Sequence, residues 1–116
     1  FFAAGGYHHH IGANIWAGSH LAPSDPQAPG LRTFSVYLPD RAALVQVVHR
    51  IEQAGSALES AIDYGRSVAC TVRDPDGIGV TLAAEVPGGL GWQETPLTLT
   101  AFHRALEDAM MTSQTD

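Results

Sequence analysis

Residues Gly5–Trp16, GGYHHHIGANIW, carry three consecutive histidines and alternate between two kinds of side chain. Read at a period of two, this stretch predicts a β-strand with two different faces. One face is mostly apolar and suits a core: His9, Ile11, Ala13 and Ile15. The other face is polar and aromatic: His8, His10, Gly12, Asn14 and Trp16. We expect this second face to look into a cleft rather than into a packed interior.

The run of histidines has three readings. It is a remnant of an expression tag, or a solvated strand with surface histidines, or part of a metal or substrate site. In the third reading His10 points inward, with His8 as the second choice. Alternation favours the third reading, and the residues alone leave all three open.

Composition indicates one globular domain. The chain has 116 residues, of which 45% are hydrophobic and 16% charged. Its formal net charge of -6 argues against nucleic acid or an anionic membrane as a partner. No apolar run approaches the roughly 20 residues that span a bilayer, and no secretory signal pattern is present. Cys70 is the single cysteine, so an internal disulfide is impossible and a reducing, cytoplasmic setting is expected.

The remaining chain predicts further strands, two helices and one long loop. Residues 17–30, with prolines at 23, 26 and 29, predict the loop. Asp40 is expected to cap a helix over residues 41–54 that ends at Gly55, and Thr100 to cap a last helix. That last helix has an apolar face: Phe102, Leu106, Ala109 and Met110. Alternating or extended segments predict strands at 31–38, 60–64, 67–72 and 78–85, with a tight turn at Asp74–Gly77 before the last of them.

This order predicts an α+β fold with an open sheet, one packed helix and a C-terminal helix. We expect a single module over residues 1–90 and a C-terminal helical tail over residues 91–116. One face of the sheet stays uncovered, and we expect it to carry His8, His10, Asn14 and Trp16. Such a face must meet another module, another chain or a ligand.

Three motifs resemble a known family: GGYHHHIGANIW, GLRTFSVYLPDR at residues 30–41, and DYGRSVACTVRDPDGIGVTL at residues 63–82. Together they resemble the last module of catechol 2,3-dioxygenase-type proteins. These belong to the vicinal oxygen chelate superfamily, with the glyoxalases and bleomycin-resistance proteins. The resemblance runs from about Phe1 to Val86. It implies a βαβββ module with an open mixed sheet, normally paired with a second module around a divalent metal.

The resemblance also assigns site residues. Ring-cleaving members hold Fe(II) with two histidines and one carboxylate. The second histidine lies on the first strand of the last module and corresponds to His10, which makes His10 the candidate metal ligand. Thr81 occupies the position of the usual glutamate, and a neutral hydroxyl is a weak ligand. Tyr64 occupies the position of a histidine near bound oxygen and is the candidate catalytic residue.

Two functions follow from these assignments. The first is an extradiol dioxygenase that cleaves a catecholic ring with O2, using Fe(II) or another divalent metal. Asn14 and Trp16 then line the substrate pocket, and the missing carboxylate comes from elsewhere. The second is a metal-free binding protein of the bleomycin-resistance type. In it Trp16, Tyr7 and Tyr64 supply aromatic surface, and Thr81 is a polar contact to the ligand. A module that serves only in assembly is a third reading.

Either function implies a small aromatic molecule as the ligand. The open face predicts pairing of two chains as a homodimer, or pairing with a missing upstream module. The chain opens on Phe1-Phe2-Ala3, which reads as the middle of a strand, so we expect a fragment or a processed product. Substrate specificity would lie in the loop of residues 17–30 and in the absent module.

Overall fold

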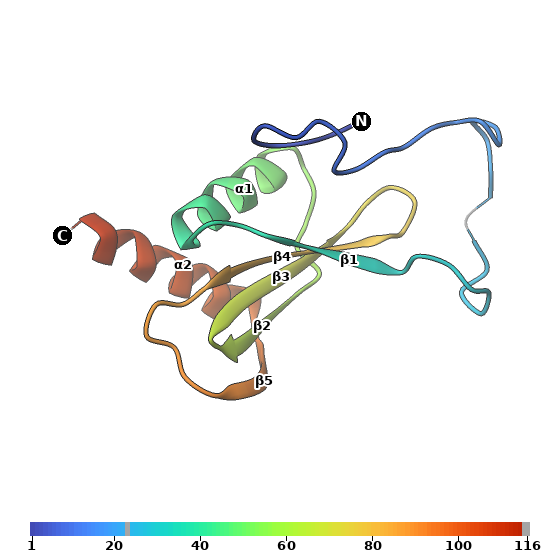
Figure 1. The fold of residues 1–116 in the computed structure, drawn as a ribbon. Coiled ribbons are helices and arrows are strands. Elements are labelled where there is room, and N and C mark those ends of the chain that lie inside the picture. The colour runs from blue at the N-terminus through green and yellow to red at the C-terminus, as the bar shows by residue number, and fades with distance from the viewer. Residues whose placement is uncertain (23, 115–116) are drawn as a thin grey trace.

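The computed structural model describes residues 1–22 and 24–114, and its regular part is a five-stranded sheet with two helices (Figure 1). The strands lie in the order β1-β4-β3-β2-β5. β1 pairs with β4 in parallel, and every other neighbouring pair is antiparallel. In chain order the elements are β1 (Thr33–Tyr37), α1 (Arg41–Gln53), β2 (Ser60–Gly65), β3 (Ser67–Arg73), β4 (Gly79–Glu85), β5 (Trp92–Leu97) and α2 (Leu99–Gln114).

The first five of these elements form the predicted βαβββ module. α1 connects β1 to the antiparallel strands β2, β3 and β4, and β1 then lies beside β4 at one edge of the sheet. The sheet is open and mixed, as the sequence indicated. The predicted α+β class is therefore confirmed.

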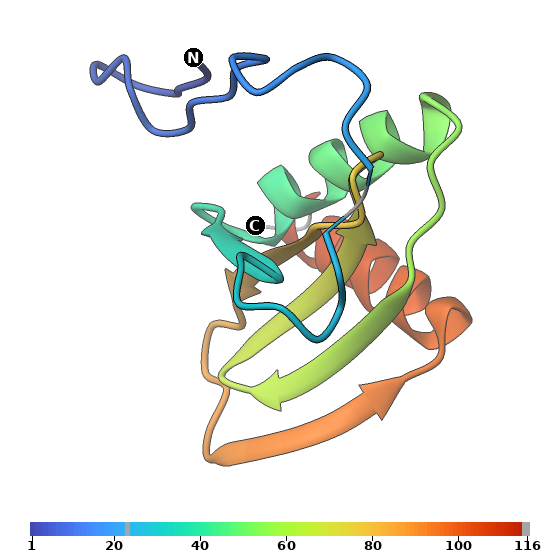
Figure 2. The ribbon, with the colours of Figure 1, turned by 90° about the vertical axis from the view of Figure 1, so that its right-hand side faces the viewer.

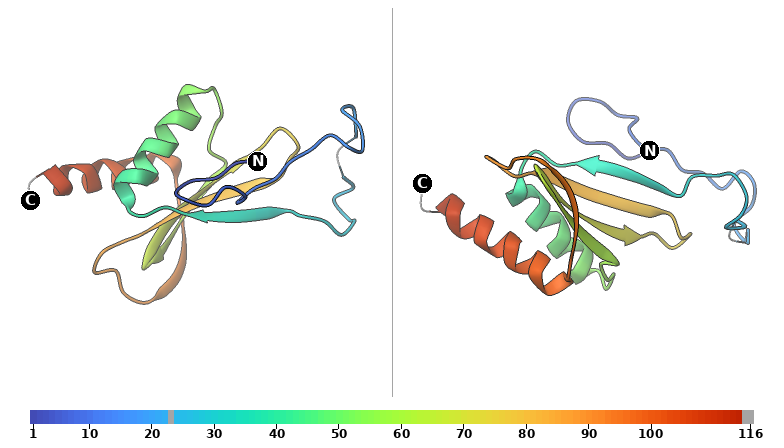
Figure 3. Two further views of the ribbon diagram at one scale, coloured as in Figure 1. Left: turned by 45° about the horizontal axis from the view of Figure 1, so that its top comes forward. Right: turned by 90° about the horizontal axis from the view of Figure 1, so that it is seen from below.

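Both helices pack against the same face of the sheet (Figure 3). Apolar side chains of β2, β3 and β4 meet those of α1 and α2 there, because alternate residues of each strand point toward the helices. The alternation predicted for residues 67–72 and 78–85 is confirmed. The cluster of buried side chains is Leu44, Val48, Leu58, Ala61, Val68, Cys70, Val72, Leu82, Ala84, Phe102 and Leu106.

Local signals set the ends of α1 and the turn before β4. Asp40 caps α1, since its side-chain Oδ1 accepts the N–H of Ala43 at 2.8 Å. Gly55 follows the helix with φ +91°, a conformation that glycine adopts without strain. In the turn after β3, the carboxylate of Asp74 accepts the N–H groups of Asp76 and Ile78, both at 2.9 Å. These features match the predicted cap, helix end and turn.

The strand predicted at Gly5–Trp16 is absent. A single bridge joins Phe2 to Ile11 across the turn at Gly5, and every residue from 1 to 22 is exposed. The side chain of Asn14 accepts the N–H of Trp16 at 3.1 Å, which turns the chain where the strand should continue. Figures 1 and 2 show this segment running beyond the β1 edge of the sheet without joining it. Alternation alone does not make a strand, because the backbone also needs a neighbouring strand to pair with.

Because the strand predicted at Gly5–Trp16 is absent, two further expectations are wrong. The first strand of the module is β1, whereas the sequence assigned that place to the histidine stretch and treated residues 31–38 as an additional strand. The uncovered face of the sheet consequently carries none of His8, His10, Asn14 and Trp16. The predicted loop at 17–30 has no helix or strand where it is described, and Pro23 lies outside the described residues.

The C-terminal part contains a strand that the sequence did not predict. β5 pairs with β2 at the second edge of the sheet, and its Pro96 is tolerated because an edge strand leaves one side unpaired. α2 is capped by Thr98 rather than Thr100, since the Thr98 hydroxyl accepts the N–H of Ala101 at 3.1 Å. Phe102 and Leu106 are buried as predicted. The Ala109 side chain and residues 115–116 lie outside the description.

Neither described helix has the length and apolar character that a membrane crossing requires.

Candidate functional site

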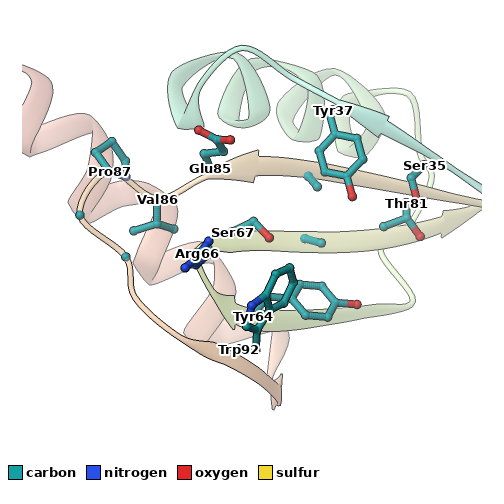
Figure 4. Close-up of a pocket in the computed structure, with 14 residues that line it drawn as sticks. Ser35, Tyr37, Tyr64, Arg66, Ser67, Thr81, Glu85, Val86, Pro87 and Trp92 are labelled. Atoms are coloured by element: carbon teal, nitrogen blue, oxygen red, sulfur yellow. The ribbon is translucent and has the colours of Figure 1, made fainter.

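The side of the sheet opposite the two helices is here called the open face. It is concave and forms a cavity with a volume of about 740 Å³. Its centre is made of small residues, since Ala69 and Ala83 face each other across β3 and β4. They are only 3% and 4% exposed although no helix covers them, because larger neighbours rise around them. Figure 4 shows these neighbours. The lining residues are Ser35, Tyr37, Tyr64, Arg66, Ser67, Ala69, Thr81, Ala83, Glu85, Val86, Pro87, Gly88, Gly89 and Trp92.

Aromatic rings surround the alanine floor on three strands. Tyr37 comes from β1, Tyr64 from β2 and Trp92 from β5 (Figure 4). Trp92 pairs with Gly65 across a register shift between β2 and β5, a bulge-type irregularity that changes how side chains emerge from a strand. Trp92 is 85% exposed, so a large apolar surface borders the cavity. A small apolar floor with aromatic walls suits a flat organic ligand.

Hydroxyl side chains form a row across the same face. The row lies two residues along the strands from Ala69 and Ala83. Thr81 lies beside Ser35 on one neighbouring strand and beside Thr71 on the other. The hydroxyl oxygens of Thr71 and Thr81 are 3.0 Å apart and share a hydrogen bond. This row supplies hydroxyl groups that can donate or accept hydrogen bonds.

The structure brings together two of the five residues that the sequence singled out. Thr81 and Tyr64 both line the cavity of the open face. His10, Asn14 and Trp16 do not line it, because all three belong to the exposed N-terminal segment.

Within that segment the three residues make local contacts. The ring Nδ1 of His10 accepts the N–H of Ala4 at 3.3 Å, and the ring lies 5.0 Å from that of Tyr7. Asn14 bonds the backbone of Trp16, whose own side chain is 91% exposed.

The donor set for a divalent metal is incomplete within this part of the protein. Among the residues that the structure describes, no three His, Cys, Asp or Glu side chains come together in a way that could hold a metal ion. Glu85 lies on the open face, but four residues separate it from Thr81 along β4, roughly 13 Å in a strand. The described residues therefore do not fit the three-ligand site that the resemblance implies.

Several lining residues were missed by sequence reasoning. Trp92 was missed with the whole of β5, whose polar, proline-containing sequence gives a weak strand signal. Tyr37 alternates with the apolar residues Phe34, Val36 and Leu38 in the sequence, which was a usable signal for an outward-facing site residue. Arg66 sits in the single-residue connection between β2 and β3, where no periodic pattern marks it.

The single cysteine plays no part in this face. Cys70 is 1% exposed and points into the core between sheet and helices. Burial, with a smaller contribution from the charge of Glu52, raises the pKa of its thiol to about 11. The thiol is therefore protonated and unreactive at neutral pH.

Comparison with known proteins shows a similarity to an enzyme. Over 75 residues, which are 65% of this chain, the sequence is 43% identical to a catechol-2,3-dioxygenase of Bacillus subtilis (strain 168). The chain spans about a quarter of the length of that relative, since the match covers 25% of it. No family profile and no solved structure matches. The similarity supports the predicted relationship to dioxygenases.

Proposed function

We propose that this chain is a module of the vicinal oxygen chelate type whose open face binds a small aromatic molecule, within a protein related to catechol 2,3-dioxygenases. The observation that carries the proposal is the meeting of Tyr64 and Thr81 in one cavity. The family resemblance selected these two positions independently of the fold. They come from different strands, and a shared cavity is what a common site requires.

The chemistry of the cavity fits a hydroxylated ring. A ring can lie on Ala69 and Ala83 and contact the side chains of Tyr64 and Trp92, since offset and edge-on aromatic pairs are favourable. Among the described residues, the Tyr64 hydroxyl has no hydrogen-bond partner, so it is available to a ligand hydroxyl. The Thr81 hydroxyl can exchange its bond to Thr71 for one to the ligand.

Ring cleavage is the second candidate, and the similarity to a catechol-2,3-dioxygenase favours it. It requires ligands beyond those on the open face, because Thr81 adds no charge to offset a divalent cation. His10 is the imidazole that the resemblance offers, and the carboxylate must come from another part of the protein or from another chain. In this candidate Fe(II) would supply the activation of dioxygen. The open face would position the ring.

Binding is tested by calorimetric titration of the chain with catechol. We expect Tyr64→Ala to weaken binding by about fivefold, because it removes an aromatic contact worth roughly 1 kcal/mol. Tyr7→Ala is the matched control, since Tyr7 is an exposed tyrosine outside the cavity. Equal affinities of the two variants for catechol would overturn the proposed site.

Catalysis is tested separately, by measuring bound metal after anaerobic reconstitution with Fe(II) or Mn(II). The test compares the native chain with Thr81→Glu and then adds catechol and O2 to look for the yellow ring-fission product. Stoichiometric metal and turnover in the native chain would reject the metal-free reading. Metal bound only by Thr81→Glu would count against native catalysis. If Tyr64→His in the Thr81→Glu background changes nothing, the role assigned to Tyr64 is wrong.

A further inference from the structure

We propose that Arg66 and Trp92 form an anion-recognition end of the open face, so that the preferred ligand is an aromatic ring bearing a carboxylate. This inference rests on the proposed function, because it names the class of ligand for the same cavity. It adds a charged group that neither the family resemblance nor the similarity to a dioxygenase assigns.

The first argument is charge. Arg66 is the single cationic residue among those that line the cavity, and Glu85, the acidic one, makes no ion pair with it. The Arg66 side chain has no ion pair and no hydrogen bond to any residue that the structure describes, whereas Arg73 pairs with Glu59 at 2.6 Å. The chain as a whole has a formal charge of -6 and repels an anion. Local recognition of an anion at this face therefore depends on Arg66.

The second argument is position. The Arg66 guanidinium carbon lies 5.5 Å from the centre of the Trp92 ring, a cation–π contact. The guanidinium makes no hydrogen bond to a described residue, so its planar fork is available to the two oxygens of a carboxylate. Figure 4 draws Arg66 at the end of the cavity that also holds Tyr64 and Trp92. A ring that contacts these two aromatic residues brings its substituent to Arg66.

The third argument is rigidity of the backbone that carries Arg66. The N–H of Val86 donates to the carbonyl oxygen of Arg66 at 2.8 Å, which joins the β2–β3 connection to the loop after β4. Next to this bond, Gly65 at the end of β2 packs closely against Gly89 of the same loop. A Cβ on Gly65 would lie 2.7 Å from the carbonyl oxygen of Leu90, and a Cβ on Gly89 would collide with the carbonyl of Gly65. Close packing fixes the base of the Arg66 side chain before any ligand arrives, which lowers the cost of binding.

The two ends of the face then recognise different groups. Glu85 pairs with Ser67, the residue after Arg66, so Arg66 belongs to the end of the face far from Thr81. Four strand residues separate Thr81 from that end, roughly 13 Å. Ring hydroxyls directed at Thr81 place a substituent on the opposite side of the ring nearest to Arg66. A carboxylate para to one hydroxyl has this arrangement.

The test compares 3,4-dihydroxybenzoate with 3,4-dihydroxybenzamide, which have nearly the same shape and differ in charge. We expect the native chain to bind the carboxylate at least about tenfold more tightly by calorimetry, as a charge-assisted bidentate contact provides. In Arg66→Gln the preference should disappear, because the affinity for the carboxylate should fall to that for the amide. Arg104→Gln is the control, because Arg104 is exposed on α2 and does not line the cavity. Circular dichroism checks that each variant is folded.

The outcomes separate this inference from the proposed function. Equal affinity of the native chain for the two compounds would overturn the anion site and leave the aromatic site standing. A preference that survives Arg66→Gln would also overturn it. Binding of neither compound would reject both proposals.

Discussion

At the scale of single residues, the Thr71–Thr81 pair shows how a binding surface is kept ready. Both hydroxyls are partly buried, and each satisfies the other at 3.0 Å. We expect Thr81→Val to lower the free energy of unfolding by about 1 kcal/mol, because Thr71 loses its partner. The double variant Thr71→Val/Thr81→Val should recover most of this loss, since no polar group remains unpaired. Urea unfolding measures both values.

A double variant that is less stable than Thr81→Val would contradict this account of the pair. The same variants separate stability from binding. Thr81→Val should weaken binding of catechol in either background, because the ligand contact is lost whether or not Thr71 is satisfied.

At the scale of elements, His103 joins α2 to α1. Its Nε2 lies 2.7 Å from Oε1 of Glu52 and its Nδ1 lies 2.7 Å from the carbonyl oxygen of Leu99. Both neighbours accept hydrogen bonds, so the ring makes both contacts only when both nitrogens carry a proton. The hydrogen bond to Glu52, followed by the one to Leu99 and by the charges of Glu52 and Glu107, raises the pKa of His103 above 6.5.

A raised pKa of His103 means that this contact stabilises the folded chain at low pH. The contribution is fully present below about pH 6.5, the value for the unfolded chain, and is lost as the pH rises through the folded pKa. Both side chains are about 40% exposed, so we expect about 0.5 kcal/mol or less. An NMR titration should give a pKa above 6.5 for His103, and Glu52→Gln should lower that pKa. An unchanged pKa in Glu52→Gln would contradict the assignment.

The loop after β4 packs closely against the end of β2, because Gly89 has no side chain to collide with Gly65. We expect Gly89→Ala to lower the free energy of unfolding by about 3 kcal/mol, because the new methyl group meets the Gly65 carbonyl and lies 3.0 Å from that of Val86. Gly30→Ala is the matched control, since nothing lies within 4 Å of a Cβ there. Thermal unfolding compares the two. Equal stability would show that the loop is free to move away from Gly65.

Elements with two agreeing signals were predictable from the sequence. β3 and β4 combine alternation with a turn at Asp74, and α1 combines an apolar stripe with the Asp40 cap. Gly5–Trp16 had alternation without a partner strand, and the partner is what decides whether a strand forms. β5 had a partner but no alternation, because an exposed edge strand needs no apolar face.

The residues of the candidate site also divide into those that were predicted from the sequence and those that were missed. Thr81 and Tyr64 were found because the family resemblance assigns both positions to the site. Arg66 and Trp92 were missed because their place depends on a connection and on an edge strand, which only the assembled sheet brings together. The resemblance therefore located one aromatic wall and the hydroxyl row of the cavity, and not its charged end.

At the scale of the whole molecule, the open face leaves one side of the sheet without a covering layer. We propose that two chains pair over it, or that another module of a longer protein does. Light scattering of the chain should then give a mass near twice 12.3 kDa at micromolar concentrations. A stable species of 12.3 kDa that does not change with concentration would contradict pairing of two chains.

The parallel pairing of β1 with β4 has a consequence for how the chain acquires its structure. β2, β3 and β4 follow one another with short connections, so they can assemble locally as soon as the chain collapses. β1 has β4 as its neighbour in the sheet and can join only after α1, β2, β3 and β4 have been placed. The entropic penalty of closing so long an intervening segment makes late docking of β1 the slow event in refolding. Substitutions that weaken the pairing of β1 with β4 should therefore slow refolding.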